Sequence, residues 1–298
     1  MSQSIAFIGL GNMGSGMAAN LAAKGHFVRA FDLSPEALEK ARLAGCAVTG
    51  SAAQAVAGAD VVVTMLPAGQ HVAAVYRDAV FPGCARGTLL IDCSTIDVGS
   101  AKTLASEAAD HGLVAVDAPV SGGIAAANAG ALTFMVGGSE EGFARAKPVL
   151  EAMGKAVIHA GASGAGQTAK ICNNMLLGAS MIATAEAFVL ARKLGLDPQR
   201  FYDIASVSSG QNWSMTSYCP LPGVGPESPA DRDYQGGFAV ALMLKDLRLA
   251  AEAAELAGVQ TPMGSKARAL YEAFAEAGQG GLDFSAIIKV LEEAPPGD

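Results

Sequence analysis

The chain has 298 residues, a length that predicts two domains, and charged residues make up 16% of it, against roughly 25% in typical soluble domains. Its 60 alanines and 36 glycines favour helices that pack closely against neighbouring backbone. The net charge of −8 argues against the clustered basic surface that nucleic acid binding requires and favours small-molecule partners.

The first 160 residues alternate short β-rich runs with helical stretches, which is typical of a parallel sheet covered by helices. Several of these runs are apolar without alternation, as expected for strands that are buried on both faces. The predicted strands span residues 5–8, 27–31, 61–66, 89–91, 114–116, 132–136 and 156–159. The helical segments between them include residues 13–24, 35–43, 97–111 and 140–153.

From residue 167 onward the pattern is helical. A long helix is predicted over residues 167–194, with Gly195 as its left-handed C-cap, followed by helices over residues 198–207, 239–257, 262–277 and 284–291. Residues 208–237, rich in Gly, Pro and Ser, are predicted to form one long irregular loop with a functional role.

These elements predict an α/β protein of two domains. Residues 1–163 are expected to form a Rossmann-type doubly wound sheet that binds a dinucleotide, and a long helix joins it to an all-α domain over residues 164–298 for substrate binding and oligomerisation. Apolar side chains occupy more than one face of the long helix, which predicts burial all round and a homodimer or homotetramer.

The sequence Gly9-Leu10-Gly11-Asn12-Met13-Gly14 fits the G-x-G-x-x-G pattern and lies between a predicted strand and a predicted helix. In this context the glycines allow a tight turn and close approach of a pyrophosphate to the helix N-terminus. The next strand ends at Asp32, whose carboxylate suits ribose hydroxyls and repels a 2′-phosphate, so NAD is predicted over NADP. The alternative is that the glycines serve only a turn and Asp32 caps the next helix.

Two further patterns carry candidate chemistry. Lys170 and Asn174 lie four residues apart on one helix face, in a stretch without other charges, and burial of such a lysine would make it usable as an acid or base. A lysine that extends to the solvent is the alternative. The segment Asp117-Ala-Pro-Val-Ser-Gly-Gly123 offers a hydroxyl and two glycine N–H groups as a cradle for a carboxylate, or forms an ordinary turn.

Together with Gly166 and with Gly237-Phe238 ahead of Lys245-Asp246-Leu247, these motifs resemble those of the β-hydroxyacid dehydrogenase family over nearly the whole chain. Residues 92–96, 132–138, 171–177 and 208–210, with Trp213, are most similar to the members that act on 3-hydroxyisobutyrate.

The resemblance implies a role for each matching residue. Lys170 would be the catalytic acid/base and Asn174 would position the substrate. The other substrate-binding residues would be Ser121, Gly122 and Gly123, which hold the carboxylate, together with Trp213, Phe238 and Asp246, the last of which would orient Lys245 or Lys170. The cofactor-binding residues would be Gly9, Leu10, Gly11, Asn12, Met13, Gly14, Asp32, Leu66, Pro67, Thr95 and Lys245, with Leu66, Pro67 and Thr95 along the nicotinamide half.

The implied reaction is the NAD-dependent oxidation of (S)-3-hydroxyisobutyrate to methylmalonate semialdehyde, a step of valine breakdown. L-serine, D-glycerate, 3-hydroxypropionate and 4-hydroxybutyrate are alternative substrates, and a non-catalytic NAD-binding sensor is the alternative from another class. Neither a metal site nor a disulfide framework is predicted, because the five cysteines and four histidines lack the required spacings. Without a secretory signal or a predicted membrane segment, the expected location is the cytoplasm.

Overall fold

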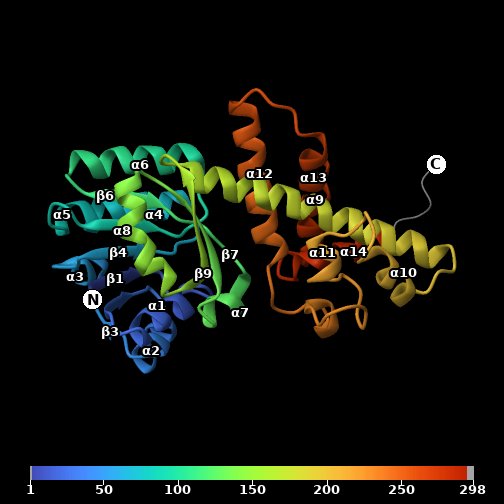
Figure 1. Ribbon diagram of the computed structural model, residues 1–298, viewed down its shortest axis with the longest axis horizontal. Helices are drawn as coiled ribbons and strands as arrows, with labels where there is room; N and C mark the ends of the chain where they lie inside the picture. Colours follow the sequence, from blue (N-terminus) through green and yellow to red (C-terminus); the bar gives the residue numbers. More distant parts are fainter. Residues whose placement is uncertain (1, 294–298) are drawn as a thin grey trace. The chain divides into compact units, whose positions relative to one another are not determined.

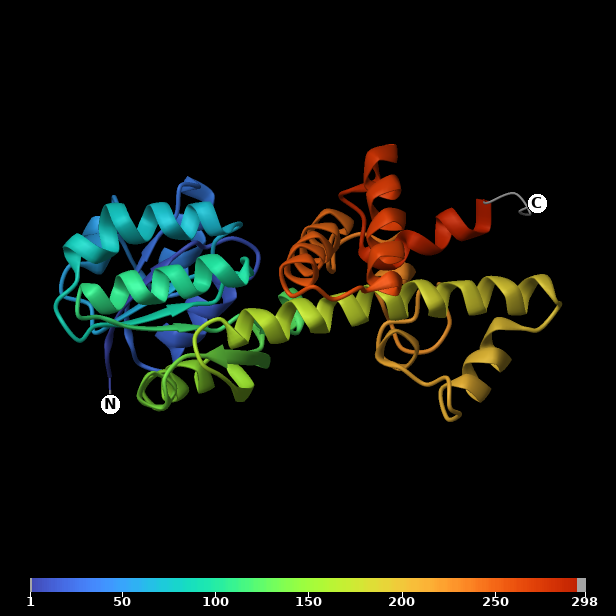
Figure 2. The same ribbon diagram turned by 90° about the horizontal axis from the view of Figure 1, so that it is seen from above.

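The computed structural model describes residues 2–293 (Figures 1 and 2). The chain forms two compact units that divide between Lys170 and Ile171. Each unit has hydrophobic core clusters of its own, two in the first unit and one in the second. The predicted class, a doubly wound sheet followed by a helical part, is confirmed.

The described part of the first unit contains a nine-stranded sheet in the order β3-β2-β1-β4-β5-β6-β8-β7, with β9 beside β8. The strands from β3 to β6 are parallel, and β8 runs antiparallel to β6 and β7. All seven predicted strands are present, whereas β3 and β7 were missed because two residues are too few to show a periodicity. The strands are β1 (Ser4–Ile8), β2 (Phe27–Phe31), β3 (Ala47–Val48), β4 (Val61–Thr64), β5 (Leu89–Asp92), β6 (Val114–Asp117), β7 (Val120–Ser121), β8 (Leu132–Gly137) and β9 (Gly154–Gly161).

Helices cover both faces of this sheet. Alternate residues of β1 show the division, since Ile5 and Phe7 pack into one core cluster and Ala6 and Ile8 into the other. One cluster takes residues from α1 (Gly14–Ala23), α2 (Pro35–Leu43), α7 (Gly123–Asn128) and α8 (Glu140–Glu151). The other takes residues from α3 (Ala52–Val56), α4 (Gly69–Val75), η1 (Tyr76–Val80), α5 (Phe81–Gly83) and α6 (Val98–Asp110). Figure 2 shows α4 and α6 on the same side of the sheet.

In its described part the second unit contains helices and no strand, and one isolated β-bridge joins Ala239 to Asp283. The long helix α9 (Ala165–Lys193) begins in the first unit and continues into the second. Gly195 follows its end, and the φ of +84° at Gly195 confirms the predicted left-handed cap. The core of the second unit includes Met181 and Phe188 of α9 and Tyr271 of α13. The other helices are α10 (Pro198–Ala205), α11 (Trp213–Thr216), η2 (Pro229–Arg232), α12 (Val240–Leu256), α13 (Pro262–Phe274), η3 (Ala275–Gln279), η4 (Phe284–Ile287) and α14 (Ile288–Glu293).

The prediction of one irregular loop over residues 208–237 was wrong for two short segments, α11 and η2. Asn212 starts α11 by accepting a hydrogen bond from the Met215 N–H, and a capping box of Ser228 and Asp231 starts η2. Helices of four residues show no apolar periodicity, so the sequence pattern could not reveal them.

Among the described residues, α9 is the one helix that is long and apolar enough to cross a membrane by length and composition. Only 39% of its most apolar window is buried within the structure. The core helix of a soluble protein meets the same criteria, so this single helix is weak support for a membrane span.

Candidate active site

The glycine-rich turn joins β1 to α1, and each of its three glycines has a different constraint. Gly9 has a φ of +98°, and a Cβ on Gly14 would overlap the carbonyl oxygen of Gly9, so the protein itself requires both. A Cβ on Gly11 would meet no protein atom within 4 Å. The space beside Gly11 is therefore open, as the close approach of a phosphate would need.

The end of β2 supports this turn. The Asp32 carboxylate accepts hydrogen bonds from the Leu10 N–H (2.6 Å) and the Ser34 N–H (2.8 Å). In α1 no side chain caps the first turn and no acidic residue lies in it, so no side chain of that turn offsets the positive end of the helix. These groups fit the pyrophosphate and ribose of a dinucleotide, with Leu10, Asn12 and Met13 supplying the rest of the turn.

A buried polar network follows β4 and β5. Asp92, the last residue of β5, accepts hydrogen bonds from Thr64 Oγ1 (2.8 Å) and from Ser94 Oγ (2.6 Å). Ser94 Oγ in turn accepts a hydrogen bond from the Leu66 N–H (2.8 Å). Since Thr95 comes directly after Ser94, this network holds two of the predicted nicotinamide-side positions, Leu66 and Thr95, at the carboxyl ends of neighbouring strands.

The first turn of α9 is anchored to the end of β6. The Asp117 carboxylate accepts hydrogen bonds from the Gly164 N–H (2.7 Å) and the Gln167 N–H (2.9 Å). A Cβ on Gly166 would lie 2.7 Å from the Asp117 carbonyl oxygen, so only glycine allows this approach. Lys170 follows on the same helix and is buried, with 8% of its surface exposed, which decides against the solvent-exposed alternative.

Burial changes the acidity of both strand-end carboxylates. It raises the pKa of Asp92 to about 6, with the nearby Asp117 charge as a minor cause, although hydrogen bonds from Ser94 and Thr64 oppose the shift. It also raises the pKa of Asp117, against the effect of the N–H groups of Gly164 and Gln167. Strand ends that hold buried acids with raised pKa values are typical of functional sites.

The predicted carboxylate cradle follows β7. Gly122 and Gly123 have φ values of +135° and +72°, a conformation that side-chain-bearing residues rarely adopt. A Cβ on Gly122 would lie 2.6 Å from the Cβ of Ala126, whereas one on Gly123 would meet nothing within 4 Å. Ser121 is half-buried and both glycines are exposed, so the hydroxyl and the backbone of this turn are accessible.

In the second unit, Asn174 and Asp246 form a buried pair. Asn174 Nδ2 donates to Asp246 Oδ2 over 2.5 Å, and each residue is 2% exposed. Lys245 Nζ lies 3.4 Å from Asp246 Oδ1. Asp246 therefore holds the predicted substrate-positioning amide and also contacts Lys245, the predicted cofactor-binding lysine.

An aromatic cluster forms around Asp283, which is fully buried. Trp213, half-exposed, stacks on Tyr218 with ring centroids 4.9 Å apart, and the Tyr218 hydroxyl donates to Asp283 Oδ2 (2.8 Å). The Phe238 N–H donates to the same oxygen (2.7 Å). Burial and the Asp283 charge raise the pKa of Tyr218. No pattern in the sequence pointed to Asp283 or Gln167, because neither belongs to a motif and their partners lie far away in the chain.

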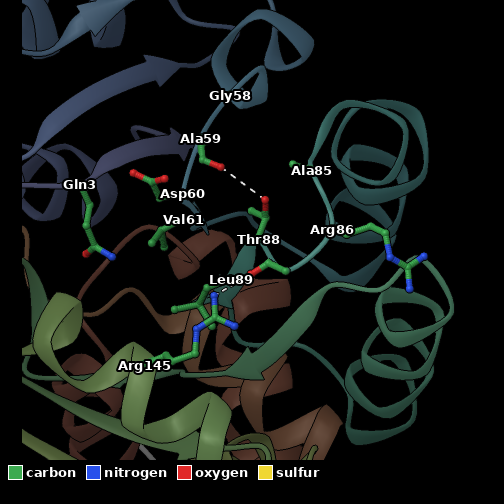
Figure 3. Close-up of a pocket in the computed structure, with 11 residues that line it drawn as sticks. Gln3, Gly58, Ala59, Asp60, Val61, Ala85, Arg86, Thr88, Leu89 and Arg145 are labelled. Carbon is green, nitrogen blue, oxygen red and sulfur yellow. Dashed lines mark hydrogen bonds between the residues drawn. The ribbon is translucent and has the colours of Figure 1, made fainter.

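A separate pocket of about 490 Å³ lies at the amino ends of β4 and β5 (Figure 3). Asp60, Arg86 and Arg145 line it, and Arg145 donates a hydrogen bond to the Gly87 carbonyl (2.6 Å). Ligands of open α/β sheets bind at the carboxyl ends of the strands, where the glycine-rich turn lies, so this pocket is not the dinucleotide site.

The fold and the glycine-rich turn define the class of dinucleotide-binding α/β proteins. Residues 4–161 match the family described as the NAD binding domain of 6-phosphogluconate dehydrogenase. Residues 164–291 match the family described as NAD-binding of NADP-dependent 3-hydroxyisobutyrate dehydrogenase. The chain belongs to the β-hydroxyacid dehydrogenase family and is an NAD-dependent oxidoreductase.

Individual relatives match over almost the full length. The 3-hydroxyisobutyrate dehydrogenase of Pseudomonas aeruginosa is 52% identical over 290 residues, covering 96% of this chain and 97% of the relative. The NAD-dependent L-serine dehydrogenase of the same organism is 49% identical over 290 residues, covering 97% of each. The solved structure of Mycobacterium tuberculosis 3-hydroxyisobutyrate dehydrogenase with L-serine has a TM-score of 0.94 and 50% identity, covering 99% of this chain and all of that one.

Two glycine substitutions separate ligand binding from folding. We expect Gly11→Ala to keep the melting temperature but to weaken NAD binding roughly tenfold or more, because its new methyl group meets only the ligand. Gly14→Ala, in contrast, should lower the free energy of unfolding by about 1–3 kcal/mol through overpacking. Calorimetric titration with NAD and thermal unfolding measure the two effects. Unchanged NAD affinity in Gly11→Ala would contradict the assignment of the turn.

Asp92 should make stability depend on pH. Its folded-state pKa lies above the unfolded value, so its contribution is largest at low pH and is lost as the pH rises through about 6. Between pH 5 and pH 7.5 the wild type should lose roughly 1 kcal/mol more unfolding free energy than Asp92→Asn, whose amide does not titrate. Urea unfolding at both pH values measures this difference. Parallel losses in the two proteins would show that Asp92 does not titrate in this range.

Proposed function

We propose that this dehydrogenase oxidises (S)-3-hydroxyisobutyrate to methylmalonate semialdehyde with NAD. The observation that carries the proposal is the buried Lys170, on a helix whose first turn is fixed to the carboxyl end of β6. Relatives 45–52% identical that carry the name 3-hydroxyisobutyrate dehydrogenase, from bacteria and from mouse, support the substrate.

Each predicted residue has a role in this reaction. Bound NAD supplies the hydride acceptor. Lys170, neutral in the competent form, removes the hydroxyl proton of the substrate as the hydride leaves the carbinol carbon. Asn174, held by Asp246, positions the substrate. The substrate carboxylate is bound by Ser121 and the N–H groups of Gly122 and Gly123, and the rest of the substrate by Trp213 and Phe238.

The cofactor residues follow the same scheme. The pyrophosphate lies against the turn from Gly9 to Gly14, and Leu66, Pro67, Thr95 and Lys245 contact the nicotinamide half. Asp32 binds the adenosine ribose and disfavours NADP, because a 2′-phosphate next to its carboxylate would be repelled. We assign cofactor binding to residues 1–163 and substrate binding and oligomerisation to residues 164–298, a functional boundary that lies seven residues before the division of the two compact units after Lys170.

L-serine is the second candidate substrate. A relative 49% identical is named an NAD-dependent L-serine dehydrogenase, and the matching solved structure contains L-serine. The two substrates share the carboxylate and the terminal CH₂OH group, and they differ in a methyl against an ammonium group. Lys170 and the cradle at Ser121 serve both equally, so the mechanism is the same for either.

The substrate is tested by initial rates of NADH formation at 340 nm. We expect kcat/KM for (S)-3-hydroxyisobutyrate to be about tenfold or more above the value for each competitor, because one substrate group that fits its pocket changes kcat/KM by about that factor. The competitors are the R enantiomer, L-serine, 3-hydroxypropionate, D-glycerate and 4-hydroxybutyrate. NADP should support much slower rates than NAD. Preference for L-serine would reassign the substrate, and activity with NADP alone would refute the role of Asp32.

Replacement of Lys170 tests the mechanism. We expect Lys170→Ala to lower kcat by roughly 10²–10⁴-fold, the usual contribution of general acid–base catalysis, while NAD binding stays close to that of the wild type. Steady-state rates with the best substrate and titration with NAD measure both quantities. Near-normal turnover in this variant would remove Lys170 from the mechanism.

We also propose that the enzyme is a cytoplasmic homodimer or homotetramer that acts in valine breakdown. Large apolar side chains lie exposed on α9 and α10, among them Leu176 (67%), Leu190 (61%) and Ile204 (58%), and a second copy would cover them. Light scattering should give two or four times the 29.9 kDa mass of the chain at micromolar concentration. A mass of one subunit would contradict this assembly.

A further inference from the structure

The side chain of Gln167 is fully buried in the first unit and bonded at both ends of its amide. Nε2 donates to the Ser94 carbonyl oxygen (2.8 Å), and Oε1 accepts from the Ile96 N–H (3.1 Å). These two bonds reach back more than 70 residues in the sequence and enclose Thr95. One side chain therefore fixes the backbone on both sides of a proposed cofactor-binding residue.

The same amide connects three segments. Ser94, whose carbonyl Gln167 binds, also accepts the Leu66 N–H through its hydroxyl. Lys170 lies three residues after Gln167 in α9, which is about one helical turn. A continuous set of hydrogen bonds thus runs from the segment after β4, through the segment after β5, to the helix that carries Lys170.

The helix does not need this side chain in order to start at its place. Asp117 already binds the main-chain N–H groups of Gly164 and Gln167, and Gly166 packs directly against β6 and β8. Among the described residues, the hydrogen bonds of the Gln167 amide go to the segment from Ser94 to Ile96. The Gln167 side chain therefore sets the position of that segment relative to α9.

We propose that Gln167 is a positioning residue for hydride and proton transfer. It holds the segment of Leu66 and Thr95, which contacts the nicotinamide half, at a fixed distance from the helix that carries Lys170, and it touches neither substrate nor cofactor. The inference rests on the proposed function. An error of about 1 Å between a base and a hydride acceptor is enough to reduce a rate by up to 10²-fold.

The test is Gln167→Met, which keeps the length of the side chain and removes both hydrogen bonds. We expect kcat to fall by about 10- to 100-fold, with the dissociation constant for NAD within about threefold of the wild type. With substrate deuterated at the carbinol carbon, the isotope effect on kcat should rise, because hydride transfer becomes slower relative to product release. If Gln167→Met does not fold, Gln167→Glu is used in its place, because the glutamate keeps an acceptor for the Ile96 N–H.

Two controls separate positioning from general destabilisation. Thr88→Val removes a buried hydrogen bond, Thr88 Oγ1 to the Ala59 carbonyl (3.4 Å), at the opposite, amino end of β5, and should leave kcat unchanged. In the double variant with Lys170→Ala, the Gln167→Met change should cause no more than about a twofold further loss, since the two residues act in one step. Additive losses would overturn the proposal.

Amide hydrogen exchange provides a readout without cofactor or substrate. In Gln167→Met the Ile96 amide should exchange at least tenfold faster than in the wild type, while the Leu10 amide, held by Asp32, stays unchanged. Unchanged Ile96 exchange, or a normal kcat in Gln167→Met, would overturn the positioning role alone. A wild type that oxidises none of the hydroxy acids would overturn the proposed function and the positioning role with it.

Discussion

The contact between the Asp117 carboxylate and the first turn of α9 determines the geometry of the first unit's candidate site. Asp117 is 6% exposed and accepts main-chain N–H groups from Gly164 and Gln167, so its charge is balanced by the positive end of the helix. Gly166 allows the helix backbone to reach β6 and β8. Because α9 begins at this point, the place of Lys170 relative to the sheet follows from one carboxylate and one glycine.

The carboxyl edge of the sheet concentrates polar groups that are expensive to bury. Asp92 and Asp117 are register partners on β5 and β6, and hydrogen bonds from Ser94, Thr64 and the start of α9 offset only part of their desolvation. At the amino edge, by contrast, Arg86 and Arg145 line an open pocket and their charges remain near solvent. Burying two carboxylates at one edge of the sheet costs folding free energy, so their presence there agrees with a reaction site and is not explained by stability alone.

Local patterns in the sequence predicted the parts of the structure that local forces determine. The seven longer strands follow from short β-rich runs, several of which, such as β4 and β5, are apolar and buried on both faces, and the end of α9 follows from Gly195. Two-residue strands and four-residue helices were missed because they depend on pairing and capping partners. Gln167 and Asp283 were missed for a related reason, since their partners lie 71 and 45 residues away, at Ile96 and Phe238. Likewise, only the folded chain shows that Lys170 is buried.

The second unit uses the same device as the first, a buried carboxylate that accepts several hydrogen bonds. Asp283 accepts from Ser285, Phe238 and the Tyr218 hydroxyl, and so it fixes the ring against which Trp213 stacks. An aromatic face binds a methyl group by contact and an ammonium group through its quadrupole. In the proposed site, where Trp213 contacts the substrate, the choice between 3-hydroxyisobutyrate and L-serine would therefore depend on the polar groups beside Trp213 and not on the indole ring itself.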